Sequence, residues 1–286
     1  MTVEEIRKSF LAGDTRRDKG LTTPEDIIRC DNIPYGEHGV WNLTDVYYPK
    51  TTTSCQKTII SIHGGAWVYG TKEQYQFYCM NLAQRGFTVV NFNYRLAPEH
   101  KYPTALEDVN QLFVWLRLHY EEYFVDLNQL YIVGDSAGAQ LASQYLIMLN
   151  NKEYATTFSF PIESEIKIKA AALNCGAYDI LKIMEISEDE GIFSYIGDTD
   201  PKTLDVLQYL NDQFPPTILT TATHDFLKEM AKPMYERLRM ANVPCKMKVY
   251  EGIDGRELCH VFHLNIRSEE AKICNDEECE FFDSIQ

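Results

Sequence analysis

The segment from residue 130 to residue 140, Leu-Tyr-Ile-Val-Gly-Asp-Ser-Ala-Gly-Ala-Gln, constrains the fold more than any other part of the sequence. Its first four residues predict a buried strand, and the residues after Gly138 predict a helix. Gly134 and Gly138 lack a Cβ, which allows a tight turn between the two elements. Such a turn strains the backbone of Ser136 and lifts its hydroxyl clear of the sheet. The segment therefore predicts a Gly-x-Ser-x-Gly nucleophile elbow, although the pentapeptide alone also occurs in ordinary loops.

The order of elements around this turn predicts an α/β fold. Apolar runs at residues 57–62, 87–94 and 168–175 alternate with segments of helical periodicity at 74–85 and 105–120. Strands that alternate with helices form a parallel sheet with right-handed crossovers. The other expected elements are an antiparallel hairpin at 30–49, strands at 215–222 and 245–250, and helices at 139–149, 230–240 and from about 268.

Two segments lie outside this alternation. Residues 1–30 are charged and helix-prone, and residues 24–28 are expected to start a second helix. Residues 178–213 mix acidic and aromatic side chains, which predicts a helical insertion that covers the core as a lid. We expect three aromatic side chains of this insertion either to line an acyl or sugar pocket or to pack within the lid: Phe193, Tyr195 and Tyr209.

Length and charge exclude several classes of protein. The 286 residues suffice for one large α/β domain or two small ones. A net charge of −15 argues against non-specific nucleic-acid binding and against attraction to anionic membranes. The first residues contain no apolar secretion signal, and no apolar run approaches the length of a membrane span. The eight scattered cysteines are therefore expected to be reduced thiols in a cytoplasmic protein.

The histidines that follow Ser136 point to a catalytic triad. A serine hydroxyl needs a positioned base, and the base needs an orienting acid. Elbow hydrolases supply these groups in the order Ser, acid, His from loops after later strands. Asp225 follows the predicted strand at 215–222, and His260 lies in the loop after the last predicted strand. Asp225 alone could be a helix cap, and a single loop histidine is usually solvated, but the ordered set favours Ser136, Asp225 and His260 as a triad.

Two further motifs carry a resemblance to a known family. Residues 63–67 read His-Gly-Gly-Ala-Trp, and residues 94–103 read Tyr-Arg-Leu-Ala-Pro-Glu-His-Lys-Tyr-Pro. With Gly-Asp-Ser-Ala-Gly at 134–138, they resemble the hormone-sensitive-lipase-like branch of the α/β-hydrolases. The resemblance covers about residues 57–265 and implies the α/β-hydrolase fold, with an eight-stranded, mostly parallel sheet flanked by helices.

The resemblance also implies a domain plan and residue roles. The whole chain, residues 1–286, would form one domain whose cap is built from about residues 1–30 and 178–213. The implied roles are Ser136 as nucleophile, His260 as base, Asp225 as orienting acid, and the N–H groups of Gly64, Gly65 and Ala137 as the oxyanion hole. His63 is expected to brace the glycine loop, and Arg95 is expected to pair with Glu99.

The sequence departs from the family pattern beside both the acid and the base. Phe226 follows Asp225 where the family has proline, and Val261 follows His260 where the family has glycine. The second departure leaves His263 as an alternative base. His260 is preferred because the family's His-x-Phe spacing is retained at His260 and Phe262.

The expected function is a serine carboxylesterase that hydrolyses short-chain acyl esters through an acyl-enzyme, with acetylated carbohydrates among the candidate substrates. Two alternatives stay open: an amidase with the same triad, and a non-catalytic protein of this fold that binds a small ligand. The retained histidine favours the enzyme. No cofactor or metal is expected, because the cysteines and histidines at 259–279 lack a compact Cys-x2-Cys pair. The expected partner is a small-molecule ester, and a homodimer through the edge of the last strand is compatible with the sequence.

Overall fold

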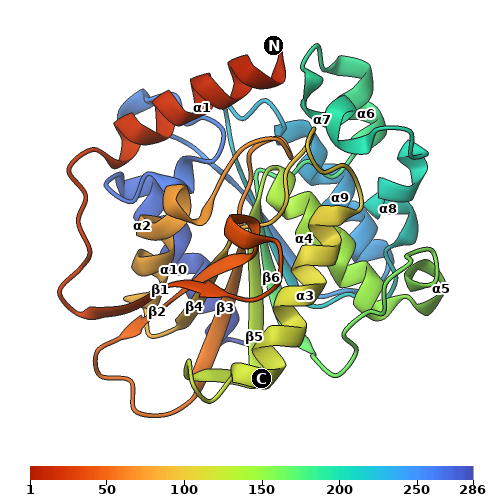
Figure 1. Cartoon of the computed structure of the whole chain (residues 1–286). Coiled ribbons are helices and arrows are strands. Elements are labelled where there is room, and N and C mark those ends of the chain that lie inside the picture. The colour runs from red at the N-terminus through yellow and green to blue at the C-terminus, as the bar shows by residue number, and fades with distance from the viewer. Residues whose placement is uncertain (286) are drawn as a thin grey trace.

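A single eight-stranded sheet runs through the centre of the protein, which is represented here by a computed structural model that describes residues 1–285 (Figure 1). The strand order is β1-β2-β4-β3-β5-β6-β7-β8. β2 pairs antiparallel with both β1 and β4, and the remaining pairs are parallel. The predicted eight-stranded, mostly parallel α/β fold is therefore confirmed. The strands are β1 (Ile27–Pro34), β2 (Leu43–Pro49), β3 (Gln56–Ile62), β4 (Thr88–Phe92), β5 (Val125–Asp135), β6 (Ile168–Asn174), β7 (Thr217–Ala222) and β8 (Cys245–Tyr250).

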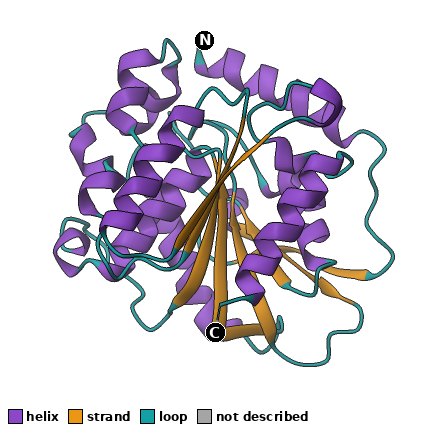
Figure 2. Cartoon of the chain, turned by 180° about the vertical axis from the view of Figure 1, so that it is seen from behind, coloured by secondary structure: helices purple, strands orange, loops and turns teal. Residues whose placement is uncertain are grey.

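Helices cover both faces of this sheet (Figure 2). The helices are α1 (Val3–Asp18), α2 (Lys72–Ala83), α3 (Thr104–His119), α4 (Ala137–Asn150), α5 (Lys152–Ala155), α6 (Ile180–Ile186), α7 (Glu190–Ile196), α8 (Val206–Tyr209), α9 (Lys228–Met240) and α10 (Glu269–Asp283). Short 3₁₀ turns form η1 (Gly39–Asn42), η2 (Pro201–Leu204), η3 (Ile253–Gly255) and η4 (Phe262–Leu264). Among the described residues, none of these helices combines the length and the apolar character needed to cross a membrane.

Alternate strand residues face opposite helical layers. Ile59 and Val89 pack with α2 and α10, whereas the next residues, Ile60 and Val90, pack with α3, α4 and α9. Successive side chains of a strand point to opposite faces, so a strand covered on both faces needs apolar residues at every position. This explains the continuous apolar runs in the sequence.

Two expectations for the first hundred residues are wrong. Residues 24–28 do not start a helix, because Ile27 begins β1 and pairs with Pro49 of β2. Arg95 does not pair with Glu99 but binds Asp108, with 2.8 Å between Arg95 Nη2 and Asp108 Oδ1. Glu99 instead binds Arg7 of α1 at 2.6 Å. The loop after β4 is therefore tied to the N-terminal helix.

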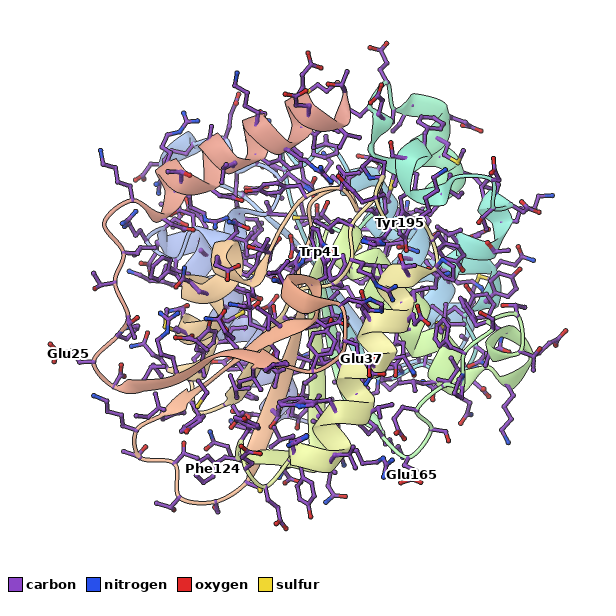
Figure 3. All side chains as sticks on the ribbon, in the orientation of Figure 1. Glu25, Glu37, Trp41, Phe124, Glu165 and Tyr195 are labelled. Carbon is purple, nitrogen blue, oxygen red and sulfur yellow. The ribbon has the colours of Figure 1, made fainter. Side chains whose placement is uncertain are left out.

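The N-terminal helix and the insertion meet over the carboxyl edge of the sheet. α1 crosses this edge beside α7 (Figure 1). The N–H of Val3 donates to Glu190 at 3.1 Å, and the N–H of Glu190 donates to the carbonyl of Met1 at 3.0 Å. Tyr195 of α7 (labelled in Figure 3) is fully buried and stacks on Trp67 with 5.6 Å between ring centroids. The hydrogen bonds join the N-terminal segment to the insertion, and the stacked rings fix the insertion on the segment that follows β3.

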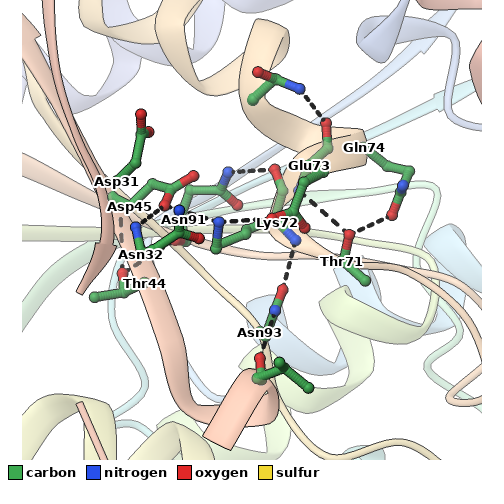
Figure 4. Close-up of polar contacts among 12 residues, drawn as sticks. Asp31, Asn32, Thr44, Asp45, Thr71, Lys72, Glu73, Gln74, Asn91 and Asn93 are labelled. Carbon is green, nitrogen blue, oxygen red and sulfur yellow. Dashed lines mark hydrogen bonds and ion pairs between the residues drawn. The ribbon is translucent and has the colours of Figure 1, made fainter. Parts of the chain in front are cut away.

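A buried ion pair anchors the start of α2 to the antiparallel part of the sheet. Lys72 Nζ lies 2.9 Å from Asp45 of β2, and each side chain is only 2% exposed. The backbone of Lys72 is held as well, because its N–H donates to Asn93 and its carbonyl accepts from Asn91 (Figure 4). A buried charge without its partner is costly, so the pair fixes the position of α2.

Replacing Asp45 by asparagine is expected to lower the free energy of unfolding by about 3 kcal/mol, because Lys72 then keeps only Glu73 as an anionic partner. Urea denaturation measures this loss. Asp31→Asn is the matched control, since Asp31 pairs with Arg29 at the surface and its loss should cost less than about 1 kcal/mol. Equal losses in the two variants would contradict a structural role for the buried pair.

A buried carboxyl group lies on the same side of the sheet, between α2 and α10. Glu278 of α10 is fully buried, and its Oε2 accepts a hydrogen bond from Tyr78 at 3.3 Å. Among the described residues, its Oε1 has no hydrogen-bond partner. Burial raises the pKa of Glu278 to about 7. The folded protein therefore holds this proton more tightly than the unfolded chain does.

The stability that Glu278 contributes is present at low pH and is lost as the pH rises from about 4.5 toward 7. Glutamine does not titrate, so only the parent should lose this stability as the pH rises. Relative to Glu278→Gln, the free energy of unfolding of the parent should therefore fall by about 2 kcal/mol between pH 5 and pH 7.5. Denaturant titrations at both pH values measure this shift, with Glu280→Gln as a control at an exposed position of the same helix. A difference that does not change with pH would contradict the raised pKa.

Candidate active site

Ser136 occupies a strained turn between β5 and α4. Its backbone angles are φ 53° and ψ −120°, a conformation that is costly for a residue with a side chain. A Cβ on Gly134 would lie 2.6 Å from the carbonyl oxygen of Gly138, and a Cβ on Gly138 would lie 2.1 Å from that of Ile62. The turn therefore requires both glycines, as the pentapeptide predicts.

Asp225 and His260 are brought together from separate loops. Asp225 follows β7, His260 follows β8, and His260 Nδ1 lies 2.6 Å from Asp225 Oδ1. The same carboxylate accepts hydrogen bonds from Thr221 at 2.7 Å and from the N–H of Leu227 at 2.9 Å. Burial alone would raise the pKa of Asp225, but these hydrogen bonds and the charge of His260 outweigh it and lower the pKa to about 2. The carboxylate is thus ionised and suited to orient the imidazole.

His263 is not placed to act as a base. Its side chain is fully buried, and in the described part of the chain neither ring nitrogen has a hydrogen-bond partner. Burial lowers the pKa of His263 to about 3. The ring packs edge-on against Tyr78, with 5.3 Å between centroids. Of the two histidines that the sequence leaves open, the geometry therefore favours His260.

Ser136 and His260 line the same cavity, which has a volume of about 360 Å³. Phe10 of α1, Ile183 and Ile192 of the insertion, and the glycine loop at 64–67 contribute to its walls. The cavity wall is therefore assembled from three parts of the chain that are distant in sequence.

The three aromatic residues expected as candidates for the pocket wall are absent from the described lining of this cavity. Phe193 is 45% exposed at the surface, Tyr195 stacks on Trp67, and Tyr209 packs against Tyr154. The interpretation that these residues line the pocket is therefore wrong. The alternative, that they pack within the lid, holds for Tyr195 and Tyr209. The reason is that the short helices of the insertion turn these rings away from the cavity, which composition alone cannot indicate.

The glycine loop after β3 offers backbone donors next to Ser136. Gly65 has φ +120°, and a Cβ there would lie 2.1 Å from the carbonyl oxygen of Tyr69, so only glycine fits. In the described chain, the N–H groups of Gly65, Ala66 and Ala137 have no intramolecular acceptor. Because Ala137 begins α4, its N–H is one of the unpaired donors of a helix start.

Gly64 differs from the expectation for an oxyanion donor. Its N–H already donates to Tyr75 Oη at 2.9 Å and is not free for a substrate. Tyr75 Oη in turn donates to Asp135 Oδ2 at 2.8 Å. Burial raises the pKa of Asp135 to about 7, despite the hydrogen bond from Tyr75. Gly64 therefore anchors the loop to the residue before Ser136, which corrects its predicted role.

Tyr75 is a residue of the site that the sequence does not reveal. It occupies an ordinary buried position of α2, and no motif marks it. Its hydroxyl nevertheless joins the glycine loop to the serine turn, because it binds both the N–H of Gly64 and the carboxylate of Asp135, which lies 60 residues after Tyr75. His63 next to this loop behaves as expected, because it is fully buried, its pKa is lowered to about 4 by burial, and Nδ1 lies 2.8 Å from the carbonyl oxygen of Gly64.

One group of side chains in the described structure could in principle hold a metal ion. Ligand atoms of Cys175, Asp225 and His260 all lie within 4.8 Å of one another. Asp225 and His260 already bind each other, and burial raises the pKa of Cys175 well above its usual value. Metal coordination needs a thiolate, so this environment opposes it. The arrangement suits a hydrogen-bonded acid and base better than a cation.

Comparisons with known proteins identify the family of the chain. Residues 59–264 match the alpha/beta hydrolase fold family. A kynurenine formamidase of Salmo salar is 30% identical over 193 residues, which cover 66% of this chain and 59% of the relative. An acetyl esterase of Salmonella typhi is 26% identical over 77% of this chain and 69% of the relative. The chain thus spans less than two thirds of the length of the first of these relatives.

Among solved structures, an inhibited esterase B from Lactobacillus rhamnosis superposes with a TM-score of 0.88 at 24% identity, over 99% of this chain and 94% of that chain. This likeness supports the fold. The family match extends from β3 to the histidine loop and contains Ser136, Asp225 and His260. The chain belongs to the alpha/beta hydrolase fold family.

Proposed function

We propose that the protein is a serine carboxylesterase that hydrolyses short-chain acyl esters. One observation carries the proposal: the strained Ser136 and His260 line the same cavity. His260 is in turn paired with Asp225, with 2.6 Å between His260 Nδ1 and Asp225 Oδ1. A structural serine has no need of a strained turn or of a histidine with a buried, ionised partner. An acetyl esterase among the relatives supports the choice of ester chemistry.

In the first step, Ser136 Oγ attacks the acyl carbonyl while His260 Nε2 takes the hydroxyl proton. Asp225 accepts the hydrogen bond from His260 Nδ1 and stabilises the imidazolium that forms. The carbonyl oxygen becomes an oxyanion and accepts hydrogen bonds from the free N–H groups of Gly65, Ala66 and Ala137. Loss of one such donor typically costs about 2.7–4 kcal/mol of transition-state stabilisation.

The tetrahedral intermediate then collapses. His260 returns its proton to the leaving alkoxide, so an alcohol departs and the acyl group stays on Ser136. In the second step, a water molecule attacks the acyl-enzyme while His260 takes its proton. Collapse of the second intermediate releases the carboxylic acid and restores the serine hydroxyl.

The size of the cavity supports a small substrate. A volume of about 360 Å³ is at the lower end of ligand pockets, and its walls include Phe10, Ile183 and Ile192. A short acyl chain suits such a space, and an acetylated carbohydrate remains a candidate. The rival reaction is hydrolysis of an amide by the same triad, which the relative named kynurenine formamidase supports.

The test is hydrolysis of 4-nitrophenyl esters from acetate to laurate by the parent and by Ser136→Ala, His260→Ala and His263→Ala. We expect turnover to peak at short chains and to fall at least about 10³-fold without Ser136 or His260. His263→Ala should retain turnover, and its melting temperature controls for lost packing. Full activity without His260 would overturn the triad. No turnover of any ester, together with hydrolysis of formamides, would favour the amidase, and binding without turnover would favour a ligand-binding protein.

Removal of the Tyr75 hydroxyl is expected to slow catalysis without weakening substrate binding. Tyr75→Phe leaves the N–H of Gly64 without its acceptor and loosens the glycine loop next to Ser136. Misplaced donors should lower kcat by about 10- to 100-fold, with little change in KM. Tyr78→Phe is the matched control, because the hydroxyl of this buried tyrosine one turn along α2 binds Glu278, and Tyr78 is absent from the described lining of the cavity. A kcat that stays at the parental value would show that the loop is held by other contacts.

A further inference from the structure

Phe226 is a large apolar side chain that the folded protein leaves largely uncovered. It is 72% exposed, although it lies between the buried residues Asp225 and Leu227. It lines the same cavity as Ser136 and His260, and its ring centroid lies 4.3 Å from that of His260. Phe193, another exposed phenylalanine, lies outside the described lining of the cavity. Of the two, only Phe226 combines exposure with a place beside the base.

We propose that the exposed ring of Phe226 binds an aromatic alcohol moiety of the substrate, so that the enzyme prefers aryl and arylmethyl esters of short acids. This inference rests on the proposed esterase function and names the alcohol half of its substrates.

The proton path indicates which half of the ester faces Phe226. His260 must return its proton to the leaving oxygen, so this oxygen lies within hydrogen-bonding reach of His260 Nε2. The alcohol moiety is attached to that oxygen and therefore extends along the surface beside the imidazole. The ring of Phe226 contacts the same imidazole. The acyl chain leaves the carbonyl carbon in another direction and does not share this surface.

The backbone on both sides of Phe226 is fixed before any ligand arrives. The N–H of Asp225 donates to the carbonyl of Ala222 at 3.1 Å, and the N–H of Leu227 donates to Asp225 Oδ1 at 2.9 Å. A phenylalanine on fixed backbone loses only its two side-chain rotations on binding, which is a small entropic cost. Aromatic rings also prefer each other in edge-on or offset contacts, which adds to the gain from burial alone. The surface thus suits a planar ring better than a flexible chain.

An alternative role for Phe226 is to shield the hydrogen bond between His260 and Asp225 from water. A shield would affect every ester to the same degree, because each turnover uses the same base. A binding surface for the alcohol would affect aromatic alcohols selectively. The two roles are therefore separated by a set of substrates with one acyl group and different alcohols.

The experiment compares benzyl, cyclohexylmethyl and ethyl acetate by acid release at constant pH, for the parent, Phe226→Ala and Phe226→Trp. In Phe226→Ala, the ratio of kcat/KM for benzyl acetate to that for ethyl acetate should fall about 3- to 10-fold, mainly through KM. Phe226→Trp should retain the ratio. Phe193→Ala is the matched control and should leave all rates at the parental values.

Two results would overturn the proposal. The first is an unchanged ratio of kcat/KM for benzyl to ethyl acetate in Phe226→Ala, whether the rates stay parental or fall equally. The second is a loss for cyclohexylmethyl acetate as large as that for benzyl acetate. Failure of the proposed function is a separate outcome, in which the parent hydrolyses none of the acetates. Binding of benzyl acetate to Ser136→Ala, with and without Phe226→Ala, then decides the inference. Weaker binding without the ring supports the aromatic site, and equal binding overturns it.

Discussion

The parallel pairing of β3 with β5 is the constraint on which the site depends. Ile62 at the end of β3 pairs with Gly134, so the glycine loop and the serine turn leave the sheet side by side. The pairing of Ala222 with Tyr250 does the same for the loops that carry Asp225 and His260. Because parallel strands end at one edge, a shift of register in either pair would separate the groups that must meet.

Several residues with strained backbone lie at this same edge. Ala66, Ser136, Cys175 and Val261 all have positive φ angles, and each follows the end of a strand. Such conformations cost about 1–3 kcal/mol each and persist only where the surroundings impose them. The continuous apolar strands and the two helical layers supply that support. The sheet thus supports several strained residues at the site, although positive φ angles also occur elsewhere, as at Phe124 before β5.

The fold and the serine turn could be read from the sequence because their signals are local. Alternating apolar and helical segments define the sheet, and the glycine spacing around Ser136 defines the turn. The choice between His260 and His263 needed the structure, since the two lie in one loop and only their burial and partners differ. Tyr75 could not be found, because its hydroxyl acts on residues that are distant in sequence.

Val261 strains the backbone of the loop that carries His260, the proposed base. It holds φ 50° directly after His260, and a β-branched residue resists this left-handed conformation. Neighbouring contacts, such as the N–H of Val261 on Cys175 Sγ at 3.4 Å, must therefore keep the loop in place. The residues that follow Val261 are buried, so packing of Phe262, His263 and Leu264 also holds the loop in place. The orientation of His260 thus depends on contacts made by the residues after it as well as on Asp225.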